Sequence, residues 1–242
     1  MQRALPQQAE KRGETVMKKK SLIMLICAVL VLTSAAFGTI AYLTAQEDVT
    51  NTFTMGDVDI TVDETEVDED GNPVLDEDDN NKRTDEGNEY RLVPGKVYTK
   101  DPTLTIKANS EDCYARLLVT YNNASELDAI FPAVDGVKPV YLVKDLNTES
   151  WVRGEDIADT AANTITFVFT YKNQDGTDIA STGETDNVLP ALFTQIEVPA
   201  ALTGEQLETL EGLEINAKGQ AIQAYSFETA ADAWAQFESQ NP

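Results

Sequence analysis

Residues 164–171 place an apolar side chain at every second position, and this pattern constrains the fold more than any other feature of the 242-residue chain. In the run Thr-Ile-Thr-Phe-Val-Phe-Thr-Tyr, the side chains of Ile165, Phe167, Phe169 and Tyr171 share one face of an extended strand. A period of two residues is typical of a strand with one face in a hydrophobic core. We therefore expect a β-sheet protein with a buried face on this strand.

Shorter runs elsewhere show the same alternation and end at turn residues. They predict strands at 58–63, 90–93, 103–107, 113–121, 140–143, 189–198, 213–217 and 221–227. Two short helices are expected. One begins after Thr203, because Gln206 stands at capping-box spacing, and the other begins after Thr229 with Trp234 on its apolar face. Many short strands with few helices predict a mostly β protein, a jelly-roll-like antiparallel β-sandwich, preceded by the helix of a signal peptide.

The N-terminal region has the pattern of a secretory signal peptide at residues 17–41. Three lysines are followed by eleven apolar residues, 22–32, and then by small residues. Thr39 and Ala41 would fill the two small-residue pockets of a signal peptidase, so that cleavage after Ala41 makes Tyr42 the first residue of the exported chain. Cleavage after Ala45 is an alternative.

A second interpretation of the same region is an uncleaved membrane anchor, because residues 21–46 carry no charge and are long enough to span a bilayer. In either case the chain contacts a membrane only through this leader. Residues 1–16 do not resemble the start of a signal peptide, and we expect them to be an extension upstream of a true start at Met17. The expected organisation is therefore an extension (1–16), a leader (17–41) and an extracellular β-sandwich domain (42–242).

Charge and composition exclude several classes of function. The part of the chain after residue 41 carries 12 basic and 40 acidic residues, and such a surface repels the phosphates of nucleic acids. The chain contains no histidine, which removes the commonest general base and the commonest zinc ligand. It has two cysteines, Cys27 in the leader and Cys113, so the exported part cannot form an internal disulfide. We expect Cys113 to be a small buried apolar residue, with pairing between two chains as the alternative.

An acidic stretch lies within residues 63–89 and has almost no apolar residue to bury. It predicts a solvated loop between strands. Oxygen ligands for a calcium ion recur in it at alternate positions, namely Asp68, Asp70, Asp76, Asp78 and Asn80. Neither run has the glycine of an EF-hand at its sixth position, so the pattern favours weak calcium binding over a specific site, and we expect no other cofactor.

Several segments resemble the TasA/camelysin family of biofilm-matrix and surface proteins, which are processed by a signal peptidase of the SipW type. The junction carries the runs 38–44 (Gly-Thr-Ile-Ala-Tyr-Leu-Thr) and 51–60 (Asn-Thr-Phe-Thr-Met-Gly-Asp-Val-Asp-Ile). Residues 94–102, 110–116 and 221–234 are similar to later segments of the family. The resemblance implies a jelly-roll fold, export by a SipW-type peptidase, and a role in extracellular fibres or matrix. The acidic insertion and the lack of histidine depart from the family.

The function that we expect is that of an exported structural protein of the cell surface or biofilm matrix, which associates with itself or with other matrix proteins. Val49, Phe53 and Met55 stand at even spacing in the segment that cleavage would free, and this segment could add as a strand to the sheet edge of a neighbour. The alternative is that it folds back as the first strand of its own sandwich.

Two other functions are alternatives: a surface adhesion or binding module with weak calcium binding, and the metallopeptidase activity described for some camelysins. The second needs metal ligands that a chain without histidine does not supply in the usual form, so we expect no enzyme activity.

Overall fold

The computed structural model describes residues 44–48, 51–54, 58–174 and 176–240, all of which fall in one compact unit, Tyr42–Pro242. The expected leader, residues 17–41, and the extension before it lie outside the described residues.

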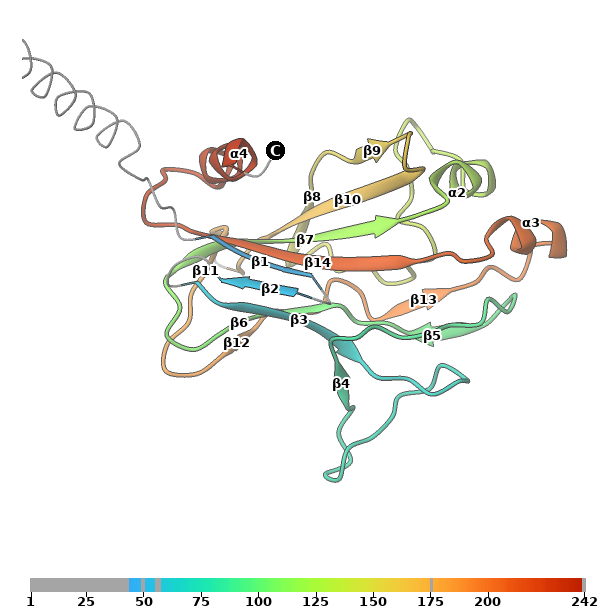
Figure 1. Ribbon diagram of the computed structural model, residues 1–242, viewed down its shortest axis with the longest axis horizontal. Coiled ribbons are helices and arrows are strands. Elements are labelled where there is room, and N and C mark those ends of the chain that lie inside the picture. Colours follow the sequence, from blue (N-terminus) through green and yellow to red (C-terminus); the bar gives the residue numbers. More distant parts are fainter. Residues whose placement is uncertain (1–43, 49–50, 55–57, 175, 241–242) are drawn as a thin grey trace, which may run out of the picture. The chain divides into compact units, whose positions relative to one another are not determined.

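The larger sheet has eight strands, and its central path runs β2-β1-β14-β7-β10-β8, with β11 pairing to β7 and β9 to β10 (Figure 1). All of its pairings are antiparallel. Its strands are β1 (Thr44–Asp48), β2 (Asn51–Thr54), β7 (Cys113–Tyr121), β8 (Trp151–Arg153), β9 (Ile157–Asp159), β10 (Thr164–Tyr171), β11 (Ile179–Ala180) and β14 (Ile215–Gln223).

The second layer consists of a four-stranded sheet in the order β12-β6-β3-β4 and a two-stranded ribbon of β13 and β5. Figure 1 shows this layer below the larger sheet, with the ribbon at the end near α3. Its strands are β3 (Ile60–Thr65), β4 (Arg83–Thr84), β5 (Val97–Thr99), β6 (Thr103–Ile106), β12 (Asn187–Val188) and β13 (Gln195–Glu197). The mostly β, antiparallel sandwich expected from the sequence is confirmed.

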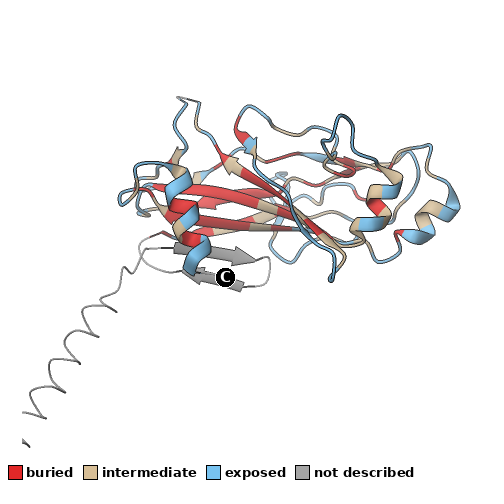
Figure 2. Ribbon diagram, turned by 90° about the horizontal axis from the view of Figure 1, so that it is seen from above, coloured by how far each residue is buried: buried red, intermediate tan, exposed pale blue. Residues whose placement is uncertain are grey.

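The core lies between the two layers, and long parts of the strands that cross it are red in Figure 2. Ile165, Phe167 and Phe169 of β10 are each at most 1% exposed, and the alternate residues of β7 are completely buried. The alternation of residues 164–171 therefore gave the correct buried face. Because both layers contribute branched aliphatic and aromatic side chains, burial of apolar surface is the main stabilising contribution.

Three helices occur in the described ranges: α2 (Ala124–Ile130), α3 (Gly204–Thr209) and α4 (Ala230–Gln240). None of them has the length and apolarity to cross a membrane. The two expected helices are confirmed. Thr203 and Gln206 form the capping box of α3, and the backbone N–H of Asp232 donates to the Thr229 hydroxyl at the start of α4.

Helix α4 packs on the outer face of the larger sheet. Trp234 and Phe237 are buried there against Tyr114 and Ile222, and the guanidinium of Arg116 stacks on the Trp234 ring at 4.1 Å. This confirms that Trp234 lies on the apolar face of the helix, which packs against the larger sheet.

Several details of the sequence prediction were wrong. Of the strand expected at 189–198, only Gln195–Glu197 (β13) is a strand. Helix α2 was not expected; its N-cap, Asn123, has a left-handed backbone (φ 52°) and makes no side-chain cap, so the usual start signal is missing. Residues 90–93 form no strand, and residues 140–143 form a turn in which Leu142 has a φ of 63°. Two strands were expected at 213–217 and 221–227, but β14 runs through the gap as one strand.

The acidic stretch is folded into two tight turns of the same construction. In the first, Asp68 Oδ1 accepts hydrogen bonds from the backbone N–H groups of Asp70 and Asn72; in the second, Asp76 Oδ1 accepts from Asp78 and Asn80. Backbone hydrogen bonds of Glu66 with Lys82 and Val74 join the segments that flank these turns. The same turn thus recurs after eight residues, in a stretch that the sequence alone identifies only as acidic.

Candidate functional site

A cleft of about 870 Å³ opens between β3 and the start of β14. Its apolar wall includes Leu92, Leu142, Ile196 and Leu213, which come from both layers and from the loops beside them. Carboxylates are also part of its lining: Glu86, Glu89, Glu208, Glu211 and Glu214. An apolar cleft with acidic groups at its side suits an extended, partly apolar ligand better than an anionic one.

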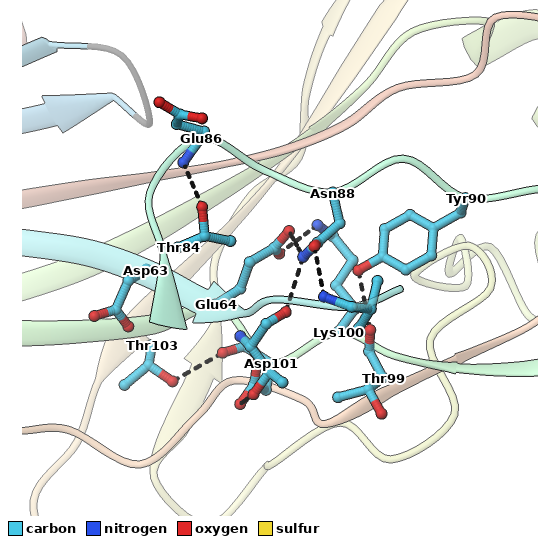
Figure 3. A network of polar contacts seen from close by, with 12 residues as sticks. Asp63, Glu64, Thr84, Glu86, Asn88, Tyr90, Thr99, Lys100, Asp101 and Thr103 are labelled. Carbon is cyan, nitrogen blue, oxygen red and sulfur yellow. Dashed lines mark hydrogen bonds and ion pairs between the residues drawn. The ribbon is translucent and has the colours of Figure 1, made fainter. Parts of the chain in front are cut away.

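Three polar side chains that line this cleft lie close together, as Figure 3 shows: Glu64 at the end of β3, Asn88 after the acidic stretch, and Lys100 after β5. Lys100 Nζ lies 2.6 Å from Glu64 Oε2, and Asn88 Nδ2 donates to Glu64 Oε1 at 2.8 Å. Glu64 and Lys100 are 6% and 5% exposed. Charges so deeply buried are tolerated because each has a partner of opposite charge and further hydrogen bonds.

The amide of Asn88 holds together the two ends of the acidic stretch. Its Nδ2 also donates to the backbone carbonyl of Thr65 at 2.9 Å, and its Oδ1 accepts from the backbone N–H of Val67 at 2.9 Å. Asn88, which follows the acidic stretch, is therefore hydrogen-bonded to Thr65 and Val67, which precede it. This arrangement fixes the carboxamide in one orientation against Glu64.

Tyr90 lies beside the group formed by Glu64, Asn88 and Lys100. Its hydroxyl donates to the carbonyl of Thr99 at 3.0 Å, and Lys100 Nζ lies 5.6 Å from the centre of its ring. Burial raises the pKa of Tyr90 above the ordinary tyrosine value, and the negative charge of Glu64 raises it further. The phenol therefore stays protonated and acts as a hydrogen-bond donor.

A second network, of ion pairs and hydrogen bonds, holds the same end of β3. Arg83 bridges Asp63 and Asp101, and Asp101 accepts a hydrogen bond from the backbone N–H of Thr65 at 2.6 Å. Desolvation lowers the pKa of the Arg83 guanidinium, but the hydrogen bonds and charges of Asp63 and Asp101 outweigh it and raise the pKa. These contacts position the end of β3 that carries Glu64.

The start of β14 borders the cleft and keeps one backbone edge open. Within the part of the chain that the structure describes, β7 pairs with β14 from Ile215 to Gln223, whereas β1 pairs with the other edge only from Gly219 to Ile222. Residues 215–217 line the cleft, and none of the described residues pairs with them on this edge of β14. Such an edge can accept an additional strand.

The residues proposed for strand addition and for cleavage are only partly placed. Phe53 belongs to β2, which forms the outer edge of the larger sheet, while Val49 and Met55 lie outside the described residues. Thr39, Ala41 and Tyr42 also lie outside them. Among the described residues of this segment, β1 pairs with β14 and β2 pairs with β1.

The residues predicted to bind calcium weakly are divided between the two acidic turns. Asp68 and Asp70 lie in the first turn; Asp76, Asp78 and Asn80 lie in the second. The hydrogen bond from the Asn72 backbone, before any other effect, lowers the pKa of Asp68, so its carboxylate is ionised and turned toward its own turn. No group of three or more histidine, cysteine, aspartate or glutamate residues in the described ranges is arranged to hold a metal ion.

Comparison with known families gives one result. Residues 16–73 match the family model described as camelysin metallo-endopeptidase. Over these residues the chain is similar to the TasA/camelysin family. The match begins just before the expected leader and ends in the first acidic turn, so it includes Glu64 but neither Asn88 nor Lys100. No curated protein and no solved structure matched the chain.

The group formed by Glu64, Asn88 and Lys100 was not found by sequence reasoning. The three residues lie in polar stretches and are separated by 24 and 12 positions, so neither spacing nor periodicity marks them. The only available signal was one asparagine and one lysine on either side of a Pro-Gly turn, which is too common to be informative.

Proposed function

We propose that this chain is an exported structural protein of the cell surface or biofilm matrix, and that it associates with further copies of itself by strand addition. The observation that carries the proposal is the pairing of β1 with the edge of β14. β1 and β2 form an antiparallel hairpin at the N-terminal end of the exported domain, and residues 55–57 connect this hairpin to the rest of the chain.

The same pairing can form within one chain or between two chains. If the hairpin of one copy pairs with β14 of the next, every backbone hydrogen bond of the pairing is kept and only the covalent connection changes. Repetition of this exchange gives a head-to-tail fibre, because each copy offers one hairpin and one β14 edge. No described residue pairs with residues 215–217 on the β1 side of β14, so this edge and the cleft beside it would give an incoming strand additional length to pair with.

Export and location are part of this proposal. A SipW-type signal peptidase would cleave after Ala41 or Ala45 and place the acidic domain outside the cell. The excess of acidic residues after residue 41 supports an extracellular, well-hydrated protein that stays apart from nucleic acids.

We expect this chain to lack the peptidase activity that the family description names. Its sequence has no histidine to hold a catalytic zinc ion in the usual way. Incubation of the exported protein with casein and zinc checks this, and cleavage that a chelator abolishes would contradict it.

The test of strand exchange uses two single-cysteine additions at one register position. Ala45 of β1 faces Ala221 of β14. When a chain with Ala45→Cys is mixed with a chain with Ala221→Cys under oxidation, a disulfide between two chains is expected, because the pairing forms in trans. Each variant incubated alone is the control, since neither then has its partner cysteine.

Electron microscopy completes the test. Fibres are expected from the unaltered exported protein, and Ala45→Pro should abolish them because proline removes a donor from the pairing. Gly204→Pro is the matched control, since this residue is the first of α3, where proline is well tolerated. Identical monomers in all three preparations, with no disulfide between chains, would refute self-association by strand addition.

A further inference from the structure

Lys100, Glu64 and Asn88 are the three groups needed to form an amide bond between two side chains. Lys100 supplies an amine, Asn88 supplies a carboxamide carbon, and Glu64 contacts both through its two oxygens, at 2.6 Å from Lys100 Nζ and 2.8 Å from Asn88 Nδ2 (Figure 3). Among the described residues, Lys100 is the only lysine whose side chain is buried. A carboxylate that bridges a buried amine and a carboxamide can transfer protons between them.

We propose that Lys100 and Asn88 condense into a covalent cross-link within the folded chain, an amide between Lys100 Nζ and Asn88 Cγ, with loss of ammonia and with Glu64 as the proton carrier.

The first step is a proton transfer inside the buried pair. Lys100 Nζ gives one proton to Glu64 Oε2, which turns an ammonium and a carboxylate into an amine and a carboxylic acid. Both products are uncharged, so the transfer removes the cost of keeping two charges out of water. It also frees the nitrogen lone pair, which makes Lys100 a nucleophile.

The second step forms the new bond. Lys100 Nζ attacks Cγ of Asn88, and negative charge develops on Oδ1. The backbone N–H of Val67 already donates to this oxygen at 2.9 Å, so a donor stands in place to stabilise the charge.

The third step releases ammonia. The carboxyl group of Glu64 rotates, so that Oε2 carries its proton to Asn88 Nδ2, where Oε1 was hydrogen-bonded, and Oε1 takes one proton from the attacking nitrogen. The bond between Cγ and Nδ2 then breaks, ammonia leaves, and an amide remains beside a neutral Glu64. Five protons are shared by the ammonium and the carboxamide at the start, and the same five are found in the amide, the ammonia and the carboxylic acid at the end. No oxidant or second substrate is required.

The position of the group suits this reaction. All three side chains line the cleft, which gives ammonia a way out, while the burial of Lys100 and Glu64 limits competition from water. The bond would join the residue at which the acidic stretch ends to the residue that follows β5. Because the exported part has a single cysteine, such a link would supply the covalent constraint that a disulfide gives other secreted domains, without sensitivity to reductants.

Peptide mapping of the unaltered full chain tests the bond directly. After denaturation, trypsin should release a joined fragment of residues 84–91 and 97–107, because Lys100 is no longer a cleavage site once its amine is acylated. The joined fragment should be lighter than the sum of its two parts by one ammonia. Recovery of 84–91 as a free peptide, with cleavage after Lys100, would overturn the proposal. Loss of ammonia without joining would do the same, since it indicates cyclisation at Asn88 alone.

Variants test the roles of the three residues. Glu64→Gln should lower the yield of joined fragment at least tenfold, and Lys100→Arg should abolish it. Asn88→Asp should give a joined fragment of the same mass, because it loses water where asparagine loses ammonia and the product is identical. Lys107→Arg is the matched control: it alters an exposed lysine paired with Asp186 and should leave the joining intact. Undiminished joining in a folded Glu64→Gln chain would refute the role of Glu64.

Discussion

Val62 on β3 and Gly219 on β14 face each other so closely that a Cβ placed on Gly219 would lie 2.5 Å from Val62 Cγ2. The same added Cβ would lie 3.0 Å from Leu104 Cδ1. The two layers of the sandwich can therefore approach here only because residue 219 has no side chain.

Gly219→Ala should accordingly destabilise the protein by about 1–3 kcal/mol, the usual cost of overpacking a core. Urea unfolding, followed by circular dichroism, measures the change. Gly183→Ala is the control, because a Cβ there meets nothing within 4 Å. Adding Val62→Ala to Gly219→Ala should recover part of the loss, and equal stabilities of the Gly219 and Gly183 variants would show that the layers adjust without cost.

Gly219 also shows why part of the fold could be predicted and part could not. Residues 164–171 and 113–121 alternate strongly enough to fix both the strand and its buried face, and Thr203 with Gln206 fixes the start of α3. Gly219 is accommodated inside β14 because Val62, from a strand far away in the sequence, packs where a side chain would otherwise lie. Tertiary packing of this kind leaves no local pattern, so the sequence predicted two strands where one exists.

The candidate site was hidden for a similar reason. Glu64 and Lys100 belong to a chain with many charged residues, and charged residues are mostly exposed. Only the fold brings these two together with Asn88 and buries the charges. The acidic turns, by contrast, could be recognised from composition as acidic but not as turns. The hydrogen bonds that Asp68 Oδ1 accepts from the backbone N–H groups of Asp70 and Asn72 exist only once the turn has formed.

The first acidic turn contacts the rest of the domain at Gly71, which has a φ of +76° and packs against the ring of Tyr98. Gly71→Ala should release the first turn from Tyr98, because a side chain there is both strained and blocked by the ring. A glutamate-specific protease should then cleave after Glu69 at least about tenfold faster, as local opening costs less free energy. Gly87→Ala is a matched control, with the same backbone region (φ +77°) and open space around its Cβ. Similar cleavage in both variants would mean that backbone strain alone matters.

Asp128 gives the protein an acid-sensitive contact between α2 and the following loop. Its carboxylate accepts hydrogen bonds from Lys138 Nζ at 2.5 Å and from the Tyr141 hydroxyl at 2.6 Å. Burial raises the pKa of Asp128, but the hydrogen bond and charge of Lys138 and the Tyr141 hydroxyl outweigh it, so the folded pKa is below the ordinary value.

A pKa that is lowered on folding stabilises the protein above the unfolded pKa of about 3.9, and this contribution is lost as the pH falls through the folded value. Asp128→Asn should therefore be less stable than the unaltered chain at pH 7, and the difference should shrink below about pH 4. Urea unfolding at several pH values measures it, with Asp85→Asn at an exposed position as the control. A difference that stays constant down to pH 2 would contradict the assignment.

Cys113 provides the last prediction, because its thiol is completely buried and its Sγ lies 3.7 Å from the carbonyl oxygen of Ala180. Burial, with a smaller effect of the Asp112 charge, raises the pKa of Cys113 to about 12. At pH 8 only about one thiol in ten thousand is then the reactive thiolate. In a Cys27→Ser chain, where Cys113 is the remaining cysteine, a maleimide should label the folded protein at least about a hundredfold more slowly than the protein in denaturant. Stoichiometric labelling of the folded chain, or dimers that a reductant dissolves, would favour pairing between two chains and show that β7 exposes this thiol.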